Sequence, residues 1–126
     1  MQLSKSLVVL DLETTGTWIE KDRIIEIALI KLNPDGTEQT FESKVNPCMP
    51  IPPVVSELTG IKDEDVKNAP VFTMIASKIV EFIGDADLAG FNAERFDIPL
   101  LNREFSDVGV KFDMSGRMIF DAQKVY

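Results

Sequence analysis

The 126-residue chain contains no histidine, only one cysteine and no long apolar run. Without histidine it cannot form a Ser-His or Cys-His hydrolase site, a histidine-ligated zinc site or an imidazole general base. The single cysteine, Cys48, cannot form an internal disulfide, which favours a reducing, cytoplasmic compartment. The longest apolar stretch near the N-terminus, Leu7 to Leu10, is too short for a signal-peptide core, and we expect no membrane partner.

Positive charge is also scarce, because 13 Lys and Arg stand against 21 Asp and Glu. The net charge of −8 and the pI near 4.5 argue against a broad basic surface for nucleic acid. Acidic side chains can instead act as metal ligands. Hydrophobic residues at 44% and charged residues at 27% are ordinary for a globular protein, and the length is that of one domain, residues 1–126.

Two aliphatic runs and one segment of alternating residues near the N-terminus predict three consecutive strands. They are Leu7 to Leu10, Arg23 to Leu32 and Thr37 to Val45, and the segment 33–36 (Asn-Pro-Asp-Gly) predicts a tight turn between the last two. No helix fits between these runs. They are therefore predicted to pair as an antiparallel meander.

The rest of the chain predicts helices that alternate with short strands. A helix that begins at Pro70 has an apolar stripe, and a second helix follows Asp97, which would cap it. Strands reached through these helices would run parallel to the first strand. The order β-β-β-α-β-α-β thus predicts an α/β fold with helices packed on a mixed sheet. Further predictions are a proline-rich loop over 46–53, two short helical turns within 54–67, the stripe Phe72, Ile75, Ala76, Ile79, Phe82 and Ile83, strands over 86–91 and 117–120, and a third helix capped by Asp121.

Asp11 and Glu13 lie directly after the first strand, and residues two apart on an extended chain share a face. Two carboxylates on one face repel, and a divalent cation is the usual reason to tolerate them. Chance alone predicts roughly 3 acid-x-acid pairs at this composition. The chain has four such pairs, 11/13, 20/22, 63/65 and 85/87. Of these, only Asp11 and Glu13 follow a buried strand, where open α/β sheets bind their ligands. We interpret it as a pair of metal ligands in preference to a plain charge pair.

The segment 90–101 carries the second candidate group, with Asn92 and Asp97. Taken alone, Asp97 can be explained as a helix N-cap and Asn92 as a turn residue. If that helix begins near the ends of the first and fourth strands, the Asp97 carboxylate can also reach a metal ion.

These segments together resemble the DEDD superfamily of 3′–5′ exonucleases. Val9 to Gly16 is similar to the first motif of that superfamily, and Arg23 to Ala28 to the segment that follows it. Leu58 to Ile61 resembles a Gly-Ile turn, and Asn92 to Asp97 is similar to the second motif. The most similar branch is the proofreading, epsilon-like exonuclease domain of bacterial DNA polymerase III.

The resemblance implies a ribonuclease-H-like fold and a site with two divalent metal ions, Mg²⁺ or Mn²⁺. Such ions generate the attacking hydroxide and stabilise the in-line phosphoryl transition state. Asp11, Glu13 and Asp97 would be the catalytic metal ligands.

The resemblance also implies a substrate, the single-stranded or frayed 3′ end of DNA, and a DNA polymerase subunit as a partner. Thr14 and Thr15 would lie under the terminal nucleotide near its 3′-hydroxyl. Leu58 and Phe96 would pack on the last bases, and Asn92 would support the site. Because this recognition depends on metal, phosphate and stacking, the residues do not separate DNA from RNA.

One part of the family pattern is missing. The superfamily has a third motif, His-x4-Asp or Tyr-x3-Asp, which supplies a fourth carboxylate and the general base. The chain has no histidine, and its only tyrosine, Tyr126, is its last residue. We therefore expect residues 1–126 to be the N-terminal two-thirds of an exonuclease domain, C-terminally incomplete and inactive alone.

Several alternatives stay open at this stage. The chain could be a non-catalytic exonuclease-fold docking module or an RNA-directed exoribonuclease. A haloacid-dehalogenase-type phosphatase is disfavoured, because its second acid would be Asp where this chain has Glu13 and because a hairpin replaces the crossover helix. Glu26 is interpreted as structural support in preference to a catalytic group. Trp18 is either a packing residue or a substrate-facing one.

Overall fold

The computed structural model describes residues 3–122, which form one five-stranded mixed sheet with helices. The first three strands pair antiparallel, and the last two extend the sheet parallel to the first. The predicted meander and the predicted parallel strands are both confirmed. The sheet has the order β3-β2-β1-β4-β5, with β1 (Leu7–Thr14), β2 (Ile24–Leu32), β3 (Glu38–Lys44), β4 (Asp87–Gly90) and β5 (Ile119–Asp121).

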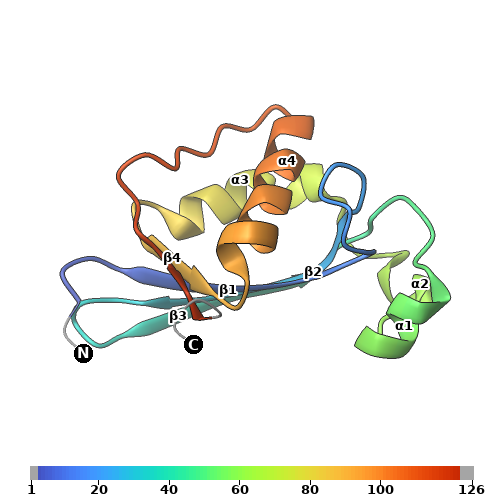
Figure 1. Cartoon of the computed structure of the whole chain (residues 1–126), viewed down its shortest axis with the longest axis horizontal. Helices are drawn as coiled ribbons and strands as arrows, with labels where there is room; N and C mark the ends of the chain where they lie inside the picture. The colour runs from blue at the N-terminus through green and yellow to red at the C-terminus, as the bar shows by residue number, and fades with distance from the viewer. Residues whose placement is uncertain (1–2, 123–126) are drawn as a thin grey trace.

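Helices α3 (Phe72–Ile83) and α4 (Ile98–Asp107) cover one face of this sheet (Figure 1). Two short helices, α1 (Pro53–Thr59) and α2 (Asp63–Val66), lie beyond the end of the sheet at which β1 ends. The apolar stripe predicted for α3 is buried except for Phe82, which is partly exposed. No helix among residues 3–122 is long and apolar enough to cross a membrane.

Successive side chains of β1 point to opposite faces of the sheet, and this alternation decides which of them enter the core. Val8, Leu10 and Leu12 are buried in the core under the helices, so Asp11 and Glu13 belong to the opposite face. Within the described residues, no helix covers that opposite face (Figure 1). The two carboxylates therefore share the open face of the sheet.

Two local predictions were wrong. β1 continues four residues past Leu10, so Asp11 and Glu13 stand inside the strand and do not follow it. Asp97 is not an N-cap: its backbone is helical, with φ −60° and ψ −49°, and its side chain makes no capping hydrogen bond. The reason is a turn of π-helix, η1 (Ala93–Asp97), that runs directly into α4, so that the Ile98 N–H donates to the Ala93 carbonyl. The predicted third helix after Asp121 lies outside the described residues, as does Tyr126.

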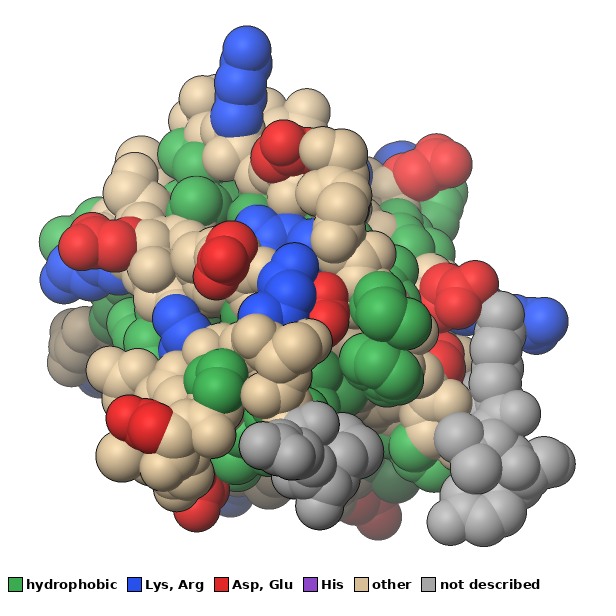
Figure 2. Space-filling view, turned by 90° about the vertical axis from the view of Figure 1, so that its left-hand side faces the viewer, with side chains coloured by type: hydrophobic (Ala, Val, Ile, Leu, Met, Phe, Trp, Pro, Cys, Tyr) green, Lys and Arg blue, Asp and Glu red, His purple; other side chains and the backbone are tan. Residues whose placement is uncertain are grey.

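Basic side chains close the C-terminal end of α3. The Lys31 Nζ donates to the Phe82 carbonyl at 2.9 Å, and the Arg117 guanidinium donates to the carbonyls of Gly84 and Ala86 at 2.6 and 2.5 Å. Carbonyls at a helix end have no partner within the helix, and cations near them are favourable. Figure 2 looks on to this end of the molecule and shows Lys and Arg side chains gathered near its centre.

Candidate functional site

Asp11 and Glu13 crowd negative charge on to the open face of the sheet. In the strand register, Asp11 stands opposite Ala28 and Glu13 stands opposite Glu26 of β2. Burial raises the pKa of Glu13, and the charges of Asp11 and Glu26 raise it further. The strand therefore holds carboxylates that repel one another.

Asp97 lies close enough to this pair to respond to it. Its side chain is buried, with 6% of the residue's surface exposed. Burial, together with the charges of Asp11, Asp121 and Glu13, raises the pKa of Asp97 to about 7. The fold thus brings together the acidic residues of the two motifs, which are far apart in the sequence.

Asp121 is the fourth carboxylate at this place and is buried like Asp97, and its role was not predicted from the sequence. It accepts the backbone N–H of Asn92 at 3.0 Å and the backbone N–H of Glu94 at 3.1 Å. Asn92 has a left-handed φ of 61°, so these bonds hold the unusual turn between β4 and η1. The signal that could have found Asp121 is its position at the end of a parallel strand beside β4.

Gly90 allows the same turn to approach β1 closely. A side-chain carbon at this position would lie 2.8 Å from the Leu10 carbonyl oxygen. The absence of a side chain therefore lets β4 end against the strand that carries the acidic pair.

Thr14 and Thr15, which were predicted to contact substrate, both make hydrogen bonds within the loop after β1. Thr14 directs its hydroxyl to the Gly16 carbonyl at 2.7 Å. Thr15 is buried; its hydroxyl donates to Asp22 at 2.8 Å and accepts the Arg23 N–H at 3.0 Å, so it orders the loop after β1.

Leu58, Phe96 and Asn92 complete the predicted substrate residues. Leu58 is 81% exposed on α1, beyond the end of the sheet. Phe96 is partly buried against the core, one residue before Asp97. Asn92 is the turn residue held by Asp121. None of these placements tests a contact with nucleic acid, so all five substrate residues stay predictions.

Glu26 and Trp18 were left open by the sequence. Glu26 is in β2, which lies between β1 and β3 in the sheet. Its carboxylate pairs with the Nζ of Lys44 in β3 at 2.9 Å, and this contact fits a structural role. Trp18 is 56% exposed, and the Lys21 Nζ lies 4.5 Å from its ring centroid. Trp18 is therefore not a core packing residue.

The donor set fits a hard divalent cation in its chemistry. Among residues 3–122, no three His, Cys, Asp or Glu side chains converge closely enough to hold a metal ion. The acidic groups are nevertheless near enough for each to disfavour ionisation of Asp97. Carboxylate oxygens are the ligands of Mg²⁺ and Mn²⁺, and a cation among them would relieve this repulsion.

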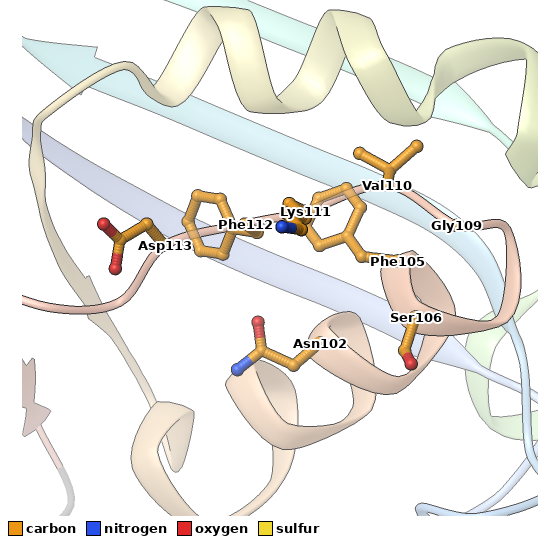
Figure 3. A pocket seen from close by; sticks show the side chains of 8 residues that line it. All are labelled: Asn102, Phe105, Ser106, Gly109, Val110, Lys111, Phe112 and Asp113. Carbon is orange, nitrogen blue, oxygen red and sulfur yellow. The ribbon is translucent and has the colours of Figure 1, made fainter.

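A hollow of about 680 Å³ lies elsewhere, between α4 and the segment 109–113 (Figure 3). Asn102, Phe105 and Ser106 line it from α4, and Phe112 lines it from the segment that follows. The rings of Phe105 and Phe112 are 5.3 Å apart between centroids. The lining includes none of the predicted site residues, so this hollow is not the candidate site.

Comparisons with known proteins agree with this arrangement. Residues 8–121 match the RNase_T family, described as exonuclease. A PolC-type DNA polymerase III from Caldanaerobacter subterraneus is 37% identical over 108 residues, which are 86% of this chain and 8% of that protein. The 3′-5′ exonuclease DinG of Staphylococcus aureus is 30% identical over 104 residues, 82% of this chain and 12% of that protein.

Solved structures support the same fold. Exonuclease I of E. coli, in complex with a 5cy-dA13 oligonucleotide, superposes with a TM-score of 0.85 at 18% identity. The match covers 97% of this chain and 29% of that one. The ribonuclease-H-like α/β fold is therefore confirmed. The chain spans only a small part of the length of each of these proteins.

Proposed function

Because this chain belongs to the RNase_T exonuclease family, we propose that it carries the catalytic carboxylates of a metal-dependent 3′–5′ exonuclease acting on DNA 3′ ends. One observation carries the proposal. Asp11, Glu13 and Asp121 are near enough to Asp97 for their charges to help raise its pKa to about 7. A cluster of acids on an open sheet face is suited to a divalent cation and a phosphodiester.

The relatives support the reaction and its direction. One is a 3′-5′ exonuclease by name, another is a PolC-type DNA polymerase III, and exonuclease I has been crystallised with an oligonucleotide. The proposed substrate is a single-stranded or frayed DNA 3′ end, and the proposed partner is a DNA polymerase subunit or domain. Such a partner would make the activity a proofreading one.

Asp11, Glu13 and Asp97 are the proposed ligands of two divalent ions, Mg²⁺ or Mn²⁺. When bound, the ions would supply positive charge that activates water and stabilises charge on the phosphate. Asp97 has to lose its proton to act as a ligand, and the cations favour this loss. Asp121 serves the site by holding the backbone of Asn92 and Glu94.

The proposed substrate contacts are Thr14, Thr15, Leu58, Asn92 and Phe96. Leu58 and Phe96 offer apolar surface, on which bases pack without regard to sequence. Asn92 stands at the start of η1, where Asp121 fixes its backbone.

The general base is the missing component. The chain contains no histidine and no Tyr-x3-Asp. We therefore infer that the 126-residue polypeptide alone hydrolyses DNA very slowly, although it contains three of the proposed ligands.

The test follows 5′-labelled single-stranded DNA with the complete polypeptide of the encoding reading frame, in parallel with the 126-residue chain. With Mg²⁺ or Mn²⁺, the complete polypeptide should shorten the labelled DNA stepwise from its 3′ end. Asp11→Ala should abolish turnover without lowering thermal stability, because removal of one carboxylate relieves repulsion. Internal cuts or cleavage in excess EDTA would contradict the proposal, and rapid turnover by the 126-residue chain would contradict the missing base.

The same assay separates the other readings. A 5′-labelled RNA of equal length reports an exoribonuclease if it is shortened faster than the DNA. A docking module without activity would bind the DNA and leave its length unchanged. Asp11→Ala would then alter neither the binding nor the length of the DNA. The lack of a general base among the residues of this chain is the observation that favours this second candidate.

A further inference from the structure

Trp18 is the only tryptophan of the chain, and its indole is 56% exposed. It stands in the loop that joins β1 to β2, four residues after Thr14. An extended chain spans at most ~3.5 Å per residue, so Trp18 lies within about 14 Å of the end of the acid-bearing strand. A strand of nucleic acid bound at the carboxylates would therefore have this side chain within reach.

The loop that presents Trp18 is fixed from inside by Asp22. One oxygen of the Asp22 carboxylate accepts the Trp18 backbone N–H at 2.7 Å, and the other accepts the Thr15 hydroxyl at 2.8 Å. The Asp22 backbone N–H in turn donates to the Trp18 carbonyl at 2.7 Å. A side-chain carbon at Gly16 would lie 2.5 Å from this carboxylate, so glycine leaves the room it occupies. These bonds fix the backbone that carries the exposed Trp18 side chain.

The loop is also attached to α4. The Arg103 guanidinium donates to the Asp22 carbonyl, and the Glu104 carboxylate accepts the Ile24 N–H at 2.9 Å. Helix α4 follows Asp97 without a break. The backbone of the loop is therefore tied to the helix that begins directly after Asp97, a proposed metal ligand.

Lys21 gives the indole a charged neighbour. Its Nζ lies 4.5 Å from the Trp18 ring centroid, in the range of a cation–π contact. More than half of the Trp18 surface still faces solvent. An aromatic ring that has a cation over one face can bind an unpaired base on its other face and the phosphate of that base through the cation.

We propose that Trp18 is a stacking platform for a nucleobase of the bound single strand and that Lys21 contacts the phosphate next to that base. The inference rests on the proposed function, because it takes a nucleic acid bound at the carboxylates as its starting point. It adds a substrate-binding residue that lies outside the two acidic motifs. The structural alternative is an exposed aromatic residue without a role, which is common on protein surfaces.

The test uses the fluorescence of Trp18, which no other tryptophan obscures. The 126-residue chain in Mg²⁺ is titrated with a short oligodeoxythymidylate whose 3′ linkages are phosphorothioates, which slows hydrolysis. In parallel, anisotropy of the same oligonucleotide with a 5′ fluorescein reports binding independently of the indole. Stacking should quench the tryptophan emission over the concentration range in which the anisotropy rises.

Variants separate stacking from general stability. Trp18→Ala should weaken binding by about 5- to 150-fold, the effect of losing one base–aromatic contact. Trp18→Phe keeps an aromatic face and should stay within about threefold of the parent. Met74→Ala removes a 67% exposed apolar side chain from α3 and should leave the affinity unchanged.

The outcomes distinguish the two proposals. Binding with quenching, lost in Trp18→Ala and kept in Trp18→Phe, supports the platform. Binding without quenching, and with equal affinity of Trp18→Ala and Met74→Ala, overturns the platform and leaves the proposed function standing. No rise in anisotropy at any concentration overturns both.

Discussion

Asp97 meets two conditions that oppose ionisation: a buried position and three nearby carboxylates. Its pKa of about 7 in the folded protein stands well above the ordinary value of 3.8. Between these two values the folded state retains a proton that the unfolded state has lost. The free energy of unfolding therefore falls as the pH rises from about 4 to above 7.

Replacing Asp97 by Asn removes this pH dependence. At pH 8 without divalent ions, Asp97→Asn should be more stable than the parent by about 2 to 4 kcal/mol. At pH 4 the two should be nearly equal, because the carboxyl group is then protonated in the folded state. Urea unfolding at the two pH values measures the difference. Asp85→Asn, at an exposed position after α3, is the control, and a stability gain that does not depend on pH would contradict the assignment.

Single residues show where sequence reasoning ends. Asp11 and Glu13 were identifiable because their spacing places them on one face of a strand whose apolar residues alternate with them. Asp97 was identifiable as a site residue but not in its backbone conformation. The contacts of Asp121 were not predictable, because it accepts N–H groups from residues that are distant in sequence.

At the scale of the element, α4 is fixed to the sheet by a buried glutamate. Glu104 is 2% exposed, and its carboxylate accepts the backbone N–H of Ile24, the first residue of β2. Burial raises the pKa of Glu104, while the Ile24 N–H and the charges of Arg103 and Arg23 oppose the rise. The hydrogen bond fixes where α4 lies relative to the start of β2.

Two substitutions at Glu104 separate its hydrogen bond from its charge. Glu104→Leu should lower the free energy of unfolding by about 1 to 3 kcal/mol, because the Ile24 N–H is left without a partner. Glu104→Gln keeps an acceptor oxygen and should lose much less. Thermal unfolding measures both, with Ser106→Ala on the exposed side of α4 as the control. Equal stability of the Leu and Gln variants would show that the hydrogen bond does not matter.

The elements were predictable where local pattern decides them. α3 follows from its apolar stripe, and the meander follows from consecutive strand segments with no helix between them. The π-helical turn η1 was not predictable, because it depends on tertiary contacts. It begins after a left-handed Asn92, whose N–H Asp121 accepts from another strand. Hydrophobic periodicity contains no information about such a contact.

At the scale of the whole molecule, the net charge of −8 was a poor guide to function. It argued against nucleic acid as a ligand, yet the chain belongs to an exonuclease family. The contradiction is resolved if part of the negative charge forms a cation site, because bound divalent ions reverse the local field. Net charge describes the sum of the surface, whereas binding depends on a few groups in one place.

A divalent cation that binds only the folded state must stabilise it. At a concentration 100 times its dissociation constant, Mn²⁺ should add about 2.7 kcal/mol to the free energy of unfolding, which raises the melting temperature of a domain of this size by about 10 °C. Asp11→Ala and Asp97→Asn should lose most of this rise, because each removes a proposed ligand. Asp85→Asn removes the same charge elsewhere and should keep the rise, and NaCl of equal ionic strength controls for screening of the net charge. If Mn²⁺ raises the melting temperature equally in all variants, the ion acts by screening and the three carboxylates do not form its site.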